Sequence, residues 1–202
     1  MASSKHVDLF GGAIGCTLPS HWRDVSTVRQ VPDNQEVYQD CTEQTGAVMV
    51  VEILQYQDDV KNDDAARFFF GDLADSNGCG DGDSILESSR VFDDAVSSND
   101  EEKSEDHVVH NILNTIKQSS AKNCCVIAVG SQRVIQGKAY TGAGTAAEKR
   151  IRVEMCIMRL ENVETDLLIT LSAPSDEPST GVSDHFRNIL SGFLINDWTL
   201  FG

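Results

Sequence analysis

Long apolar stretches are missing from this sequence, and so are the usual targeting signals. Hydrophobic residues make up 40% of the 202 residues, yet no apolar run approaches the roughly 20 residues that a membrane-spanning helix needs. Residues 1–6 lack the apolar segment of a secretory signal and are too few for a transit peptide. We therefore expect a soluble intracellular protein that does not associate with membranes.

Positive charge is also scarce. The chain carries 16 Lys and Arg against 32 Asp and Glu, which gives a formal net charge of -16 at pH 7. Such a field repels nucleic acids and anionic lipids and favours basic partners. Solubility alone is the alternative explanation. The charge thus argues against nucleic acid as a partner but does not identify the partner.

Patterns that hold metals or form disulfide frameworks are absent. The sequence has six cysteines but no C-x-x-C pair, and four of the cysteines lie within apolar or strand-like stretches. Buried free thiols in a reducing compartment explain this distribution. His107 and His110 would share one side of a helix, but no third ligand accompanies them. We expect neither a zinc site nor disulfide bonds.

Catalytic signatures are missing as well. The sequence contains no H-E-x-x-H, G-x-S-x-G or P-loop motif. Residues 142–147 match G-x-G-x-x-A, but a strand pattern follows them, whereas a dinucleotide site needs a helix there. We interpret this motif as a hairpin loop. We expect a protein that is not an enzyme and that needs no cofactor or metal.

The hydrophobic periodicity that is present predicts an α+β fold. Alternating or β-branched runs typical of strands occupy residues 35–40, 47–54, 85–91, 124–134, 150–160 and 165–171. Helical spacing marks about residues 62–73, 107–118 and 180–193, and Asn62 or Asp63 can cap the first of these helices. Most strands follow one another through short turns, which favours an antiparallel sheet. The helices must then cover that sheet in one layered core.

One polar stretch near the N-terminus is unusual. It gathers carboxylates and amides into turns, with one cation among them: Asp24, Arg29, Asp33, Asn34, Gln35 and Glu36. Turn chemistry alone explains the Pro-Asp-Asn portion. A binding patch is the rival interpretation, because functional groups are often displayed on turns held by a rigid sheet.

Several segments, with their spacing, resemble the Mog family. They are LFGGA at residues 9–13, DVS at 24–26, Arg29, VPDNQEV at 31–37, VEIL at 51–54, TDLLIT at 165–170 and DWTLFG at 197–202. The resemblance covers nearly the whole chain. The VPDNQEV segment, in its LFGGA context, is the most specific part of it.

This resemblance implies a fold and an activity. The fold would be a mostly antiparallel sheet of about six strands flanked by helices on both faces, an α/β/α sandwich shared with PsbP-like proteins. Family members bind the GTPase Ran, promote release of its guanine nucleotide and serve nuclear transport. We accordingly expect a single, monomeric Ran-binding domain spanning residues 1–202, located in the nucleus and also in the cytoplasm.

The expected Ran-binding residues are Asp24, Arg29, Asp33, Asn34, Gln35, Glu36 and Glu52. Gln55 stands where relatives carry an acid, so we assign it no charge. Residues 93–118 diverge from the family pattern, and we expect a loop or helical insertion there. A PsbP-like photosystem subunit and an acidic adaptor without nucleotide-release activity are the alternative functions.

Overall fold

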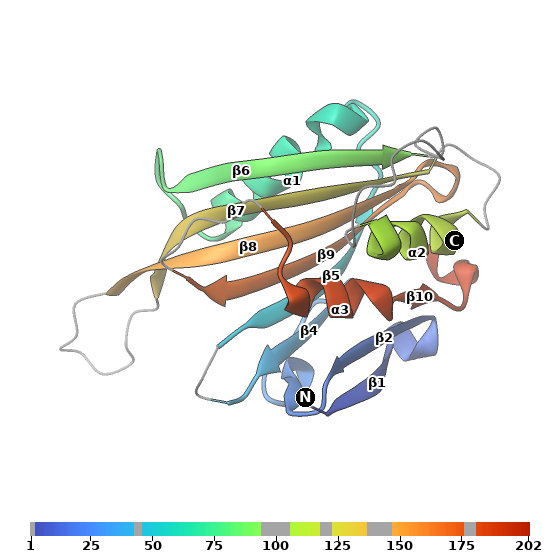
Figure 1. Cartoon of the computed structure of the whole chain (residues 1–202), viewed down its shortest axis with the longest axis horizontal. Helices are drawn as coiled ribbons and strands as arrows, with labels where there is room; N and C mark the ends of the chain where they lie inside the picture. Colours follow the sequence, from blue (N-terminus) through green and yellow to red (C-terminus); the bar gives the residue numbers. More distant parts are fainter. Residues whose placement is uncertain (1–2, 43–45, 94–105, 118–122, 137–146, 176–180) are drawn as a thin grey trace.

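The computed structural model describes residues 3–42, 46–93, 106–117, 123–136, 147–175 and 181–202 (Figure 1). Its strands are β1 (Ser4–Leu9), β2 (Ile14–Pro19), β3 (Trp22–Asp24), β4 (Gln35–Asp40), β5 (Val48–Gln55), β6 (Ser84–Asp93), β7 (Cys124–Gln136), β8 (Ala147–Leu160), β9 (Thr165–Pro174) and β10 (Leu194–Ile195). Its α-helices are α1 (Asn62–Ser76), α2 (Asp106–Ile116) and α3 (Asp184–Ser191). Short 3-10 turns are η1 (Phe10–Gly12), η2 (Val25–Thr27), η3 (Glu161–Val163) and η4 (Trp198–Phe201).

The strands form two antiparallel sheets. The larger sheet has seven strands in the order β3-β4-β5-β9-β8-β7-β6, and β1, β2 and β10 form a separate three-stranded sheet. The predicted α+β class with a mostly antiparallel sheet is confirmed, and the larger sheet has seven strands where about six were expected. Strands β3 and β10 contain three and two residues, which is too short for an alternating pattern to reveal.

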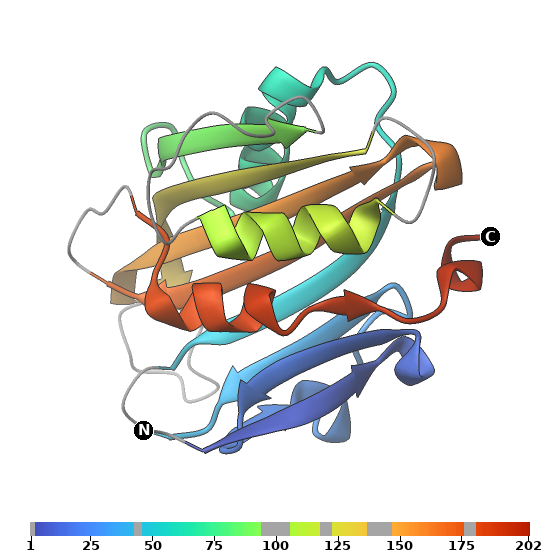
Figure 2. The same ribbon diagram turned by 45° about the vertical axis from the view of Figure 1, so that its right-hand side comes forward.

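Helices cover both faces of the larger sheet, as predicted. In Figures 1 and 2, α1 lies behind β6–β8, while α2 and α3 lie side by side on the opposite face, with the three-stranded sheet next to α3. Successive side chains of β8 point to opposite faces of the sheet and so pack in both layers. Met155 and Ile157 pack with α1, whereas Cys156 and Met158 belong to the core under α2 and α3.

Two neighbouring cysteines on β7 show the same two-sided burial. Adjacent residues Cys124 and Cys125 point to opposite faces of β7 and are both buried, because each face has its own helical layer. All six cysteines are free thiols, and four of them are buried.

Helix α2 lies within the divergent segment 93–118. Its residues Ile112 and Ile116 are almost completely buried in the main core, so this part of the segment contributes to the packing of the domain. Residues 94–105 lie outside the described part of the chain. Among the described helices, none is both long and apolar enough to cross a membrane.

Candidate functional site

The predicted binding residues lie at the end of β3, on β4, on β5 and on the loop between β3 and β4. Gln35 on β4 and Glu52 on β5 are directly opposite each other in the ladder. Gln35 Nε2 donates to Glu52 Oε1 at 2.7 Å, and Asn34 Nδ2 approaches the same oxygen at 3.4 Å. Both donors are neutral amides. They therefore orient the Glu52 carboxylate without cancelling its charge.

Asn34 is itself held in place by the main chain of β5. Its Nδ2 donates to the carbonyl of Ile53 at 3.1 Å, and the amide of Ile53 donates back to the Asn34 carbonyl at 2.9 Å. These bonds fix the turn just before β4. We call Asn34, Gln35 and Glu52 the amide-carboxylate cluster.

Glu36 points to the other face of β4, because neighbouring residues of a strand alternate. Its Oε1 accepts a hydrogen bond of 2.7 Å from the backbone amide of Phe10 in η1. Phe10 and Gly11 have φ values of 49° and 65°, a left-handed conformation that is unfavourable for a bulky residue such as Phe. The carboxylate thus stabilises a strained turn. The LFGGA and VPDNQEV segments of the sequence meet at this bond.

Asp24 is the last residue of β3, and Arg29 and Asp33 lie on the connection between β3 and β4. The side chain of Asp24 caps η2 by accepting from the amide of Ser26 at 2.7 Å. Arg29 and Asp33 are exposed. Within the described part of the chain, no hydrogen bond or ion pair joins their side chains to Glu36 or Glu52. Hydrogen bonds between described side chains thus join Asn34, Gln35 and Glu52, whereas Arg29 and Asp33 are not bonded to the two glutamates.

Tyr38 reveals a carboxylate that the sequence interpretation missed. Burial, together with the smaller effects of the negative charges of Asp24, Glu36 and Asp8, raises the pKa of Tyr38 to about 12. Asp8 lies on β1, and only the folded arrangement brings it near residues of β3 and β4. A second group of acids, Asp8, Asp24 and Glu36, thus lies near enough to the buried Tyr38 to raise its pKa.

We predict that Tyr38 ionises about two pH units above an ordinary tyrosine. Its folded-state pKa lies above the ordinary tyrosine value of 10.0, so its stabilising contribution is complete below pH 10 and is lost as the pH rises towards 12. Absorbance titration of wild type minus Tyr38→Phe measures this midpoint. Asp24→Asn, which keeps a capping side chain, should lower it. A midpoint near 10, or no response to Asp24→Asn, contradicts this arrangement.

A buried ion pair beside β5 was also missed. Arg159 Nε lies 3.1 Å from Asp166 Oδ1, and the two side chains are 1% and 0% exposed. Arg159 also donates to the carbonyl of Gln57 at 2.6 Å and to Asn62 Oδ1 at 3.0 Å, and its guanidinium lies 4.4 Å from the ring centre of Tyr56. This one side chain therefore holds the β5–α1 connection and the first residue of α1.

The carboxylate of this pair is bound equally firmly. Asp166 Oδ2 accepts from the amide of Gln57 at 2.8 Å. Burial raises the pKa of Asp166, and the Gln57 hydrogen bond and the positive charge of Arg159 oppose that rise. Arg159 and Asp166 lie opposite each other in the β8–β9 pair. Because this hairpin was predicted from the sequence, its register was the signal that could have revealed the ion pair.

The described residues contain no group of three or more His, Cys, Asp or Glu side chains placed to hold a metal ion. The side chains of His107 and His110 lie outside the described residues, as do residues 142–146 of the glycine-rich motif. Strand β8 does follow that motif, in an antiparallel pair with β7. A strand in this position has no helix N-terminus to offer a dinucleotide.

Comparison with protein families identifies the chain. The model of the Ran-interacting Mog1 protein family matches residues 7–174. The chain belongs to the Mog1 family. A Ran guanine nucleotide release factor from Danio rerio is 31% identical over 82% of this chain and 76% of the relative. The Bos taurus protein of the same name is 27% identical over 100% of this chain and 99% of the relative.

Solved Mog1 structures have the same fold. A point mutant of Mog1 aligns with a TM-score of 0.65 and 19% identity, covering 99% of this chain and 100% of that structure. The Ran-binding protein Mog1p of Saccharomyces cerevisiae aligns with a TM-score of 0.60 and 19% identity, with complete coverage of both chains. A cyanobacterial PsbP structure reaches a TM-score of 0.48, which is too low to support a photosystem role for this chain.

Proposed function

We propose that this protein binds the GTPase Ran and promotes release of its guanine nucleotide, in support of nucleocytoplasmic transport. The observation that carries the proposal is membership of the Ran-interacting Mog1 family across residues 7–174. Relatives named Ran guanine nucleotide release factor and nuclear import protein support the same activity. We further propose that the chain acts as a monomeric, non-catalytic regulator comprising one domain over residues 1–202.

The location and the partners follow from the same proposal. A transport regulator of this kind works in the nucleus and also in the cytoplasm. Its net charge of -16 is unfavourable for nucleic acids and anionic membranes. A protein partner with a cationic pocket therefore fits it best.

Small GTPases hold their nucleotide through P-loop amides, a lysine and Mg²⁺, which are positive features. A release factor must bind the empty GTPase more tightly than the loaded one, because only a difference in affinity shifts an equilibrium. A shift from 1:99 to 99:1 requires about 5.5 kcal/mol. Exposed ion pairs supply roughly 0–1 kcal/mol each. Charge at the open surface is therefore insufficient.

Glu36 and Glu52 suit this requirement better than Asp33 or Arg29. Both glutamates are partly buried, and each is oriented by fixed donors, the Phe10 amide for Glu36 and the amides of the cluster for Glu52. A carboxylate has about four acceptor sites, and the Phe10 bond occupies one of those of Glu36. We propose that these two carboxylates interact with the cationic nucleotide pocket, with Asp24, Arg29 and Asp33 at the periphery.

The test measures release of a fluorescent guanine nucleotide from Ran with and without the purified protein. We expect faster release and the strongest binding to nucleotide-free Ran, measured by pull-down with empty, GDP-loaded and GTP-loaded Ran. Binding without faster release would instead indicate an adaptor. Absence of binding in every loading state at low salt would contradict the proposal.

A further inference from the structure

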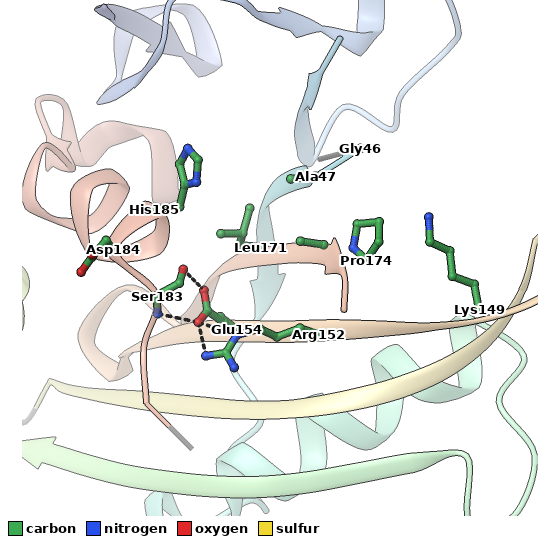
Figure 3. A pocket seen from close by; sticks show the side chains of 11 residues that line it. Gly46, Ala47, Lys149, Arg152, Glu154, Leu171, Pro174, Ser183, Asp184 and His185 are labelled. Atoms are coloured by element: carbon green, nitrogen blue, oxygen red, sulfur yellow. Dashed lines mark hydrogen bonds and ion pairs between the residues drawn. The ribbon is translucent and has the colours of Figure 1, made fainter. Parts of the chain in front are cut away.

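A hollow of about 570 Å³ opens on the α3 side of the large sheet, beyond the first turn of that helix (Figure 3). Its floor consists of Ala47, just before β5, and of Leu171, Ala173 and Pro174 on β9. The floor is open because two of these side chains are single methyl groups. Glu52 on β5 lies five residues after Ala47, about 16 Å in extended backbone. The hollow is therefore separate from the amide-carboxylate cluster.

One wall of the hollow is rigid. The Glu154 side chain is 2% exposed, and its Oε1 accepts from Arg152 Nη2 at 2.6 Å and from the Ser183 amide at 2.7 Å. Its Oε2 accepts from Ser183 Oγ at 2.5 Å, and this hydroxyl in turn accepts from the Phe186 amide and caps α3. The charges of Arg152 and Glu154 compensate each other, and their bonds fix the start of α3 against β8.

The remaining polar groups of the hollow favour an anion. Figure 3 shows Lys149 and His185 on opposite sides of the hollow, whereas the carboxylate of Asp184 points away from it. Asp184 is 2.6 Å from Arg187 Nη1, so its charge is compensated outside the hollow. Lys149 is then the uncompensated positive charge of the hollow, in a chain whose net charge is -16.

We propose that this hollow binds a small amphipathic anion, a molecule with a compact apolar body and one carboxylate or sulfonate group. The apolar body packs on Leu171, Ala173 and Pro174, the anionic group faces Lys149, and His185 lines the opposite side of the hollow. The volume lies within the roughly 300–1,000 Å³ of pockets that hold small molecules. This site goes beyond the proposed action on Ran, because it shares none of the residues proposed for that action.

The test uses 8-anilinonaphthalene-1-sulfonate, which combines an aromatic body with a sulfonate, and the full-length chain. We expect saturable 1:1 binding by fluorescence, with amide shifts in NMR spectra centred on Ala173 and Ser183. Lys149→Glu replaces an attraction with a repulsion and should weaken binding about fivefold or more. Ala173→Leu fills the floor and should abolish binding.

Lys61→Glu is the matched control, since it makes the same charge change at an exposed residue outside the hollow and should leave the affinity unchanged. Circular dichroism checks that each variant is folded, and Lys149→Glu alone decides the matter if Ala173→Leu unfolds. Lack of saturable binding, or equal effects of Lys149→Glu and Lys61→Glu, would overturn the proposal. Nucleotide release from Ran should be normal with Lys149→Glu, so the two proposals fail independently.

Discussion

Replacing Arg159 with methionine is expected to lower the free energy of unfolding by about 3–5 kcal/mol, because it leaves the Asp166 carboxylate buried without its cation. The variant also lacks the hydrogen bonds from Arg159 to Gln57 and Asn62, so the β5–α1 connection loosens at the same time. Urea denaturation followed by circular dichroism measures the change as a lower midpoint at a similar slope.

Two further variants show whether the buried charge is the cause. Arg67→Met on the exposed side of α1 should change the stability by less than about 0.5 kcal/mol. The double variant Arg159→Met with Asp166→Leu should recover a large part of the loss, because it removes both charges together. A double variant no more stable than Arg159→Met would show that the other bonds of Arg159 matter more than the ion pair.

Reversing the charge at Glu52 is expected to slow Ran nucleotide release by about 30-fold or more. Loss of a partly buried charge contact across an interface costs roughly 2–5 kcal/mol, and each 1.4 kcal/mol is a factor of ten. Glu52→Lys should show this in the fluorescent nucleotide-release assay. Glu36→Gln should also slow release, although its amide oxygen can still accept from the Phe10 amide.

The structure also ranks the other acids. Asp33→Lys should have a smaller effect, because Asp33 is exposed and exposed pairs contribute roughly 0–1 kcal/mol. Asp72→Lys on the exposed surface of α1 is the matched control and should be neutral. Thermal unfolding confirms that each variant is folded. If Asp33→Lys slows release more than Glu52→Lys does, the contact is centred on the loop before β4 and our assignment is wrong.

The sequence was sufficient for the elements that depend on local periodicity. Alternation in 150–160 and 165–171 predicted the β8–β9 hairpin, and helical spacing in 107–118 predicted α2. The predicted N-cap of α1, Asn62 or Asp63, was wrong. Lys61 occupies that position without a side-chain cap bond, and Asn62 instead accepts from Arg159 on β8. A contact between residues 97 apart overrode the local preference.

The candidate site shows the same division. The pairing of Gln35 with Glu52 follows from the register of two predicted strands. By contrast, the bond from Phe10 to Glu36 and the approach of Asp8 to Tyr38 depend on where the three-stranded sheet packs against the large one. Strands β3 and β10 are too short to be seen in a periodicity, so no pattern in one sequence gives that packing.

The placement of Glu36 and Glu52 has a consequence for the shape of the partner. They lie on neighbouring rungs of one ladder and point to opposite faces, and β3 begins to pair with β4 at Tyr38. A flat surface resting on either side of the sheet would touch one carboxylate and miss the other. A protein that contacts both carboxylates must therefore have a concave cleft, into which the ends of β4 and β5 insert.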